Sequence, residues 1–155
     1  MRELAWPPAD EPPTELLAEL RARVGDARIV PIAIVRTERT VVILHDRAGG
    51  AVELADDRVR AEDGASGVRR AWREWEAELL AGADPSLLDE LEPVLLAAGA
   101  APSLSPAKIA RATGRLVGWA RANGASPERI AALEALDEAD RAAASAAAGP
   151  SRRHA

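Results

Sequence analysis

The sequence predicts an α+β protein in which a three-stranded antiparallel meander is followed by helices. Between residues 27 and 80, β-branched and apolar residues form three stretches that are separated by loops containing glycine. Beyond Gly82 the leucines change to helical spacing, and Asp-Pro and Ser-Pro pairs mark the expected helix starts. A chain of 155 residues has room for one domain with a real core, not comfortably for two.

The amino-acid composition argues against several classes of function. The chain has no cysteine, which excludes disulfides, thiolate chemistry and cysteine-based zinc sites. It has only two histidines, His45 and His154, so a histidine-rich metal site or a Ser-His-Asp triad is not expected. The net charge of −5 gives no general attraction to nucleic acid. No apolar run approaches the roughly 20 residues of a membrane span, and no signal peptide is recognisable, so we expect no membrane partner and a cytoplasmic location.

The chain begins with a proline-rich stretch and a helix. Residues 1–13 contain four prolines and predict an extended, poorly ordered lead-in. Thr14 is suited to cap a helix in which Leu16, Leu17, Leu20 and Val24 have helical spacing, and Gly25 follows as a stop.

The strands come next. Residues 27–46 predict one long strand or two short ones meeting near Thr37–Thr40, and Pro31 favours an edge position or a bulge near the start. Asp46–Gly50 has the composition of a hairpin loop, with a return strand over 51–61. A loop over 62–67 leads to a third strand over 70–80.

Three helical segments follow. Asp84 and Pro85 open the first, and Pro93 inside it predicts a kink or two short helices. Residues 105–122 predict a second helix. Ser126 caps a third, which reaches about residue 147 and leaves 149–155 as a tail.

The segment RAWREWEAELL at 70–80 carries the main functional signal. It places Trp72, Glu74, Glu76 and Glu78 at every second position, which is one face of a strand. Three carboxylates in a row repel one another, so a metal ion or basic side chains across the sheet would stabilise them. The alternatives are the start of a helix or a strand face turned to solvent.

In a meander, more charged residues join this face. The expected set is Glu53, Asp57, Glu74, Glu76 and Glu78, with Arg36 or Arg39 from the first strand. The two arginines are three positions apart, so only a bulge would align both. Carboxylates mixed with arginines suit Mg²⁺ or Mn²⁺ bridging to a phosphate chain. The alternative is a solvated face with ordinary ion pairs, and a bulge would make Asp56 rather than Asp57 the inward acid.

The order of four segments resembles a known family. VPIAIVRTERTVVIL, AVELADDRV, WREWEAELL and GAAPSLSPAKIARA are similar to the second half of the CYTH domain, the triphosphate tunnel family of inorganic triphosphatases, thiamine triphosphatases and class IV adenylate cyclases. The closest type is the actinobacterial one, in which CYTH precedes a helical CHAD domain associated with polyphosphate. The resemblance covers residues 14–112, so 113–155 would lead toward an absent CHAD domain.

The resemblance implies a closed antiparallel barrel with a charged interior that holds triphosphate with one or two Mg²⁺ or Mn²⁺ ions. It makes Arg36, Arg39 and Lys108 phosphate-binding residues, although Lys108 taken alone is more simply a solvated helix lysine. It makes the metal ligands the following residues: Glu53, Asp57, Glu74, Glu76 and Glu78.

The family's Glu-x-Glu-x-Lys strand has no counterpart here. We therefore expect a truncated half-tunnel that binds its ligands weakly and is inactive alone, because half a barrel leaves strand edges unpaired and inner charges unneutralised. A complementing chain or a homodimer would supply the missing half. The alternatives to such a hydrolase are a non-catalytic module that binds polyphosphate or nucleotide, and a remnant that serves protein–protein association.

Overall fold

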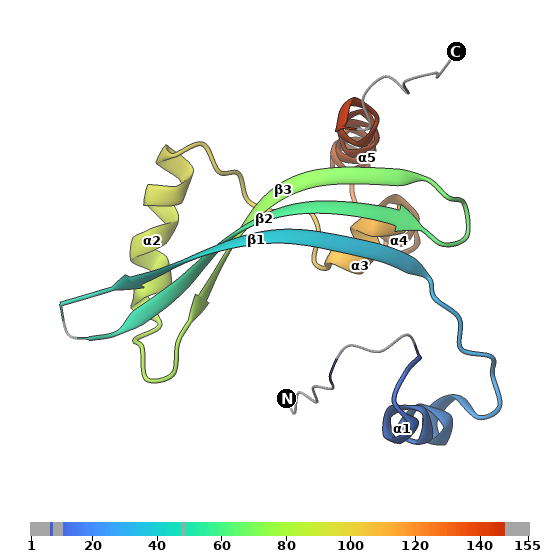
Figure 1. Cartoon of the computed structure of the whole chain (residues 1–155). Coiled ribbons are helices and arrows are strands. Elements are labelled where there is room, and N and C mark those ends of the chain that lie inside the picture. Colours follow the sequence, from blue (N-terminus) through green and yellow to red (C-terminus); the bar gives the residue numbers. More distant parts are fainter. Residues whose placement is uncertain (1–6, 8–10, 48, 148–155) are drawn as a thin grey trace, which may run out of the picture. The chain divides into compact units, whose positions relative to one another are not determined.

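The computed structural model describes residue 7 and residues 11–47 and 49–147, and its chain divides into two compact units, residues 1–31 and 32–155. The first unit contains α1 (Thr14–Val24) (Figure 1). Thr14 is the first helical residue rather than the cap, because Pro13 occupies that position. The helix ends as predicted at Gly25, which has a φ of 63°. Most of the predicted lead-in lies outside the described residues.

The second unit is built on a three-stranded antiparallel sheet in the order β1-β2-β3 (Figure 1). The strands are β1 (Ala33–His45), β2 (Ala51–Asp63) and β3 (Arg69–Leu79). The predicted meander is thus confirmed, and residues 33–45 form one long strand rather than two. Pro31 lies before β1, where its missing N–H removes no hydrogen bond from the sheet.

Both hairpin loops are held by aspartates at strand ends. In the first, the Asp46 carboxylate accepts a hydrogen bond from the Gly50 N–H at 2.7 Å. In the second, the Asp63 carboxylate accepts from the Ser66 N–H at 3.0 Å and from its hydroxyl at 2.5 Å. These are the side chain-to-backbone bonds that favour aspartate in turns. They fix the register of the three strands.

The helices of this unit are α2 (Ser86–Ala97), α3 (Lys108–Ala112), α4 (Leu116–Ala122) and α5 (Pro127–Ala147). The Asp84 carboxylate accepts a hydrogen bond from the Ser86 N–H at 2.9 Å, as expected for a helix start, and α2 is a single helix that contains Pro93. The predicted helix over 105–122 is wrong. It is split into α3 and α4 because Gly114 adopts a left-handed conformation, with a φ of 65°.

The helices form two groups along the sheet. Figure 1 shows α2 near one end and α3, α4 and α5 near the other. Helix α5 packs on β3, α3 contacts β1 and β2, and α4 packs on α5. One small core joins Val59, Ala61 and Trp72 of the sheet to Ala112 of α3, and a second is centred on Leu116, Ala120 and Leu133. Helices α3 and α5 therefore pack on the same half of the sheet.

Helices α4 and α5 belong to the same compact unit as the sheet, which spans residues 32–155. The reason is physical contact: α5 packs directly on β3. In the described part of the chain, no helix combines the length and the apolar composition needed to cross a membrane.

Candidate functional site

The strand register gathers the predicted charged residues on one face of the sheet. Arg39, Asp57 and Glu74 are direct cross-strand neighbours, and Glu76 stands opposite Ala55 one step along the same face. We call this side the charged face, and we call Asp57, Glu74 and Glu76 the carboxylate cluster. Ligand oxygens of the three cluster residues lie within 4.8 Å of one another. Such crowded carboxylates need positive charge nearby.

Asp57 is the centre of the cluster. Its side chain is fully buried and accepts two hydrogen bonds from Arg39, both 2.7 Å long. The Lys108 ammonium group donates a third, at 2.6 Å. The hydrogen bond from Arg39, and then the contact with Lys108, outweigh burial and lower the pKa of Asp57 to about 2.

Lys108 is shared by all three carboxylates. Besides Asp57, its nitrogen lies 3.2 Å from Glu74 Oε1 and 3.1 Å from Glu76 Oε1. Burial lowers the pKa of Lys108, but its hydrogen bond with Asp57 and its close contacts with Glu76 and Glu74 outweigh this effect, so the net shift is upward. Glu76 also accepts a hydrogen bond from Arg39 at 2.5 Å. The predicted phosphate-binding residues Arg39 and Lys108 are thus the counterions of the cluster.

The other predicted site residues lie outside the carboxylate cluster. Arg36 is on the opposite face, because the register from Ala33 to His45 is continuous and contains no bulge to bring it round. The same continuity excludes Asp56 from the charged face, where Asp57 is the inward acid. Glu53 and Glu78 are on the charged face, directly opposite each other. No ion pair joins either of them to another described residue.

A second layer of charged residues borders the cluster at the α3 side. Arg111 lies over the Trp72 ring, with 4.6 Å between the guanidinium carbon and the ring centroid, and it pairs with Asp140 of α5. Arg70 of β3 donates to Asp137 of α5 at 2.6 Å and to the Ala112 carbonyl at 3.1 Å. Sequence reasoning missed these pairs. Arg111 follows Lys108 by three positions on one helix, which is a usable signal, but nothing local connects either arginine to α5.

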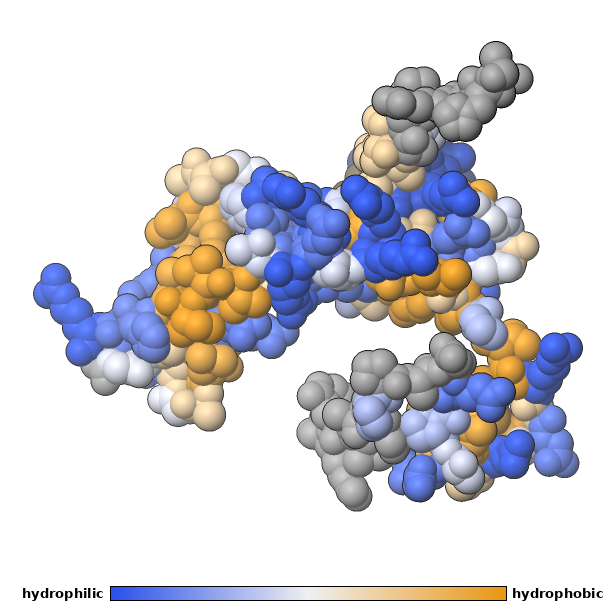
Figure 2. Space-filling view, viewed as in Figure 1, coloured by the Kyte–Doolittle hydropathy of each residue, from blue (hydrophilic) through white to orange (hydrophobic). Residues whose placement is uncertain are grey.

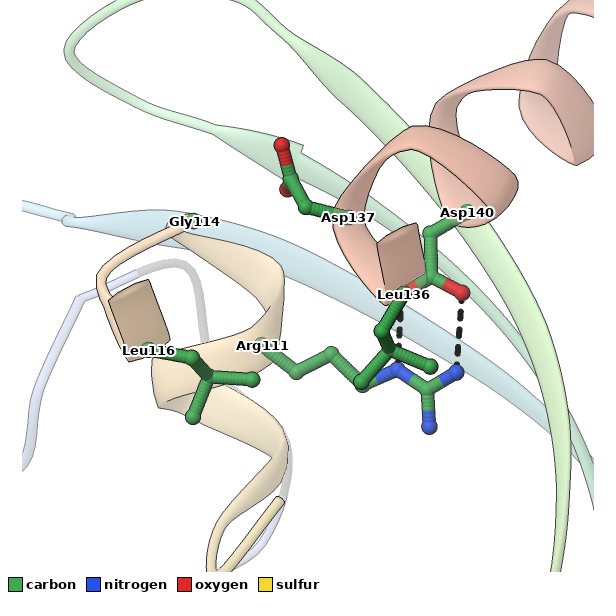
Figure 3. A pocket seen from close by; sticks show the side chains of 6 residues that line it. All are labelled: Arg111, Gly114, Leu116, Leu136, Asp137 and Asp140. Atoms are coloured by element: carbon green, nitrogen blue, oxygen red, sulfur yellow. Dashed lines mark hydrogen bonds and ion pairs between the residues drawn. The ribbon is translucent and has the colours of Figure 1, made fainter. Parts of the chain in front are cut away.

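Two hollows adjoin the site. The smaller, lined by Arg111, Gly114, Leu116, Leu136, Asp137 and Asp140, is shown in Figure 3. The larger is an open groove of about 750 Å³ between β3 and α2, which reaches Glu74 and Arg111. Its apolar lining includes Trp75, Leu88 and Leu91, and Figure 2 shows a broad hydrophobic surface over α2. The charged face is therefore bordered by an apolar groove.

The hydrogen bonds that Asp57 accepts from Arg39 and Lys108 predict a specific loss of stability in acid. Its pKa is about 2 in the folded chain and roughly 3.9 when unfolded. A lowered pKa stabilises the fold above pH 4, and that contribution disappears as the pH falls from about 4 to about 2. We expect urea unfolding between pH 5 and pH 2.5 to show that the wild type loses up to about 2 kcal/mol more than Asp57→Asn. Equal losses would contradict this assignment.

Together, fold and site define an α+β protein whose antiparallel sheet carries a charged face. Two relatives are similar to this chain: Uncharacterized protein MT2285 of Mycobacterium tuberculosis strain CDC 1551 / Oshkosh, and Uncharacterized protein Rv2226 of strain ATCC 25618 / H37Rv. Each is 36% identical over 143 residues, covering 83% of this chain. The chain spans only 28% of the length of these relatives. No family model matches the chain, and no solved structure matches it.

Proposed function

We propose that this chain is a CYTH-type, triphosphate-binding module whose charged face holds a phosphate chain together with Mg²⁺ or Mn²⁺. The observation that carries the proposal is the convergence of three carboxylates with Arg39 and Lys108. Carboxylate oxygens are the ligands that Mg²⁺ prefers, and guanidinium and ammonium groups bind phosphate oxygens. The order of segments that resembles the CYTH domain supports the same reading.

The net negative charge of the charged face means that phosphate can bind there only together with a divalent cation. Five carboxylates stand in and beside the cluster, namely Glu53, Asp57, Glu74, Glu76 and Glu78, against the cations Arg39 and Lys108. Two further arginines on this side are paired with carboxylates of α5, Arg70 with Asp137 and Arg111 with Asp140. A bare polyanion would be repelled. A bound divalent cation would offset the carboxylate charge and contact phosphate oxygens. Arg39 and Lys108 would then be free to exchange carboxylate partners for phosphate, because both side chains are partly exposed.

Hydrolysis of a phosphate chain requires more positioning and cationic groups than the charged face supplies. Phosphoryl transfer depends on positioning and on neutralising charge around the transferred group. Among the described residues, no strand pairs with the outer edge of β1 or β3. Both edges of the sheet that carries the charged face are therefore unpaired. We therefore propose binding without substantial turnover for the isolated chain. A complementing chain or a second copy would have to supply further cationic residues for catalysis.

A second candidate is a module for protein association. It is favoured by the apolar groove along α2 and by the exposed apolar residues of the edge strand β1, which include Ile34, Val42 and Ile43. An apolar surface of this kind is typical of interaction sites. This function would not depend on the carboxylate cluster, which separates it from phosphate binding.

Isothermal titration of tripolyphosphate into the purified chain tests the proposal. We expect saturable binding that requires Mg²⁺ and that falls by about 10-fold or more in Glu74→Ala/Glu76→Ala. The matched control is Glu38→Ala/Glu62→Ala, which removes two carboxylates from the opposite face and should keep wild-type affinity. Absence of binding at millimolar tripolyphosphate with Mg²⁺ would contradict the proposal. A rate of hydrolysis typical of intact triphosphatases would contradict the expected lack of turnover.

A further inference from the structure

Helix α5 places a buried carboxylate beside the site. Asp140 is only 4% exposed and accepts two hydrogen bonds from Arg111, at 2.7 Å from Nε and 2.8 Å from Nη2 (Figure 3). Such a paired, two-point contact fixes both the distance and the plane of a guanidinium group. Asp140 therefore determines where Arg111 lies, although it contacts no residue of the carboxylate cluster itself.

Arg111 in turn borders Glu74. Its remaining nitrogen, Nη1, is 4.0 Å from Glu74 Oε2, outside hydrogen-bond distance. The same oxygen accepts a hydrogen bond from the Trp72 indole N–H at 2.9 Å, and Arg111 covers the Trp72 ring. One oxygen of Glu74 is thus held on the α3 side.

The other oxygen of Glu74, Oε1, lies within the carboxylate cluster. Glu74 Oε1 is buried and accepts no well-directed hydrogen bond, although the Lys108 nitrogen lies 3.2 Å away. Were Arg111 free to move closer, it would form a direct ion pair with Glu74 and turn this carboxylate away from Asp57 and Glu76. Asp140 holds the other two guanidinium nitrogens of Arg111, Nε and Nη2.

We propose that Asp140 is a positioning residue, which holds Arg111 back from Glu74 and so keeps Glu74 Oε1 directed into the carboxylate cluster. The inference rests on the proposed function, because the cluster is the part that would bind Mg²⁺ and phosphate. It extends that function to α5, the helix that the sequence assigned to a separate segment after residue 112. On this view α5 belongs to the binding site.

The first test is titration of tripolyphosphate with Mg²⁺ into Asp140→Asn, where affinity should fall about 10-fold. Asp137→Asn is the matched control. It removes a carboxylate from the same helix and the contact with Arg70, but it contacts neither Arg111 nor Glu74. We expect Asp137→Asn to unfold at lower urea and to keep its affinity within about 2-fold.

A double-mutant cycle separates positioning from a general loss of structure. If Asp140 acts only by restraining Arg111, Asp140→Asn should have no further effect on affinity once Arg111→Gln is present. An equal loss of affinity in both backgrounds would overturn the proposal.

A spectroscopic readout distinguishes failure of this proposal from failure of the proposed function. The indole N–H signal of Trp72, identified in a ¹⁵N–¹H spectrum by its loss in Trp72→Phe, reports the contact with Glu74. It should shift in Asp140→Asn and in Arg111→Lys, which keeps the charge but loses the planar fork, and should stay in place in Asp137→Asn.

Two further outcomes overturn the inference. If wild-type protein binds no tripolyphosphate with Mg²⁺, the proposed function fails and the binding role of Asp140 fails with it. If the wild type binds but Asp140→Asn changes neither the affinity nor the Trp72 signal, the positioning role fails alone.

Discussion

Replacing Asp57 by alanine is expected to destabilise the fold by about 2–4 kcal/mol, a large share of the stability of an ordinary domain. The side chain is fully buried and takes three charge-assisted hydrogen bonds from Arg39 and Lys108. Removing this carboxylate leaves Arg39 and Lys108 without the acceptor that they share and creates a cavity beside them. The cost falls below that of a completely buried pair, because Arg39 is 39% exposed and retains its contact with Glu76.

The neighbouring residue provides a matched control. Asp56 also pairs with an arginine through two hydrogen bonds, at 2.7 and 2.8 Å from Arg73, but on the opposite face. Its side chain is 28% exposed and that of Arg73 is 55% exposed. Exposed pairs contribute little, so Asp56→Ala should destabilise the fold much less than Asp57→Ala. Urea unfolding of both variants at pH 7 measures the difference, and equal losses would show that burial of Asp57 has no energetic consequence.

Gly114→Ala is expected to destabilise the fold by about 3–4 kcal/mol, through backbone and side-chain effects together. Gly114 has a φ of 65°, which disfavours any residue with a Cβ atom. A Cβ atom here would lie 2.1 Å from Arg70 Nη2 and 2.8 Å from its guanidinium carbon. Arg70 is 6% exposed and is held by Asp137 and the Ala112 carbonyl, so it cannot withdraw without losing these bonds.

Gly124 separates the two contributions. It has a similar φ of 69°, and a Cβ atom there would meet nothing within 4 Å. Gly124→Ala should therefore show only the backbone cost of about 1–2 kcal/mol. The difference between the variants, measured by thermal unfolding, gives the energy of displacing Arg70. If Gly114→Ala were no worse than Gly124→Ala, the contacts of Arg70 with α3 and α5 would not restrain it.

Much of the fold could be predicted because its signals are local. Runs of β-branched residues, glycine-containing loops and Asp-Pro or Ser-Pro helix starts act within a few residues of the chain. They gave the meander and the starts of α2 and α5 within a residue or two. The prediction failed where a local signal was ambiguous. Gly114 is compatible with a helix interior in sequence, and the break is seen only in its left-handed backbone, with a φ of 65°.

The sequence by itself also determined the alternation that puts Glu74, Glu76 and Glu78 on one face, because the period of a strand is fixed by its backbone. It left open whether Arg36 or Arg39 joins them and whether Asp56 or Asp57 is the inward acid. The continuous register decided both questions, because a sheet without a bulge allows only one residue of each pair on a given face.

Only the tertiary structure connected α5 to the site. Asp137 lies 67 residues beyond its strand partner Arg70, and Asp140 lies 29 residues beyond its partner Arg111 on α3. Nothing in the local sequence distinguishes either aspartate from a solvated helix aspartate. Their partners Arg70 and Arg111 are identified only when β3, α3 and α5 pack together. Alternation along a strand is a property of the local backbone, whereas the choice of a buried ion-pair partner depends on which elements exclude water from it.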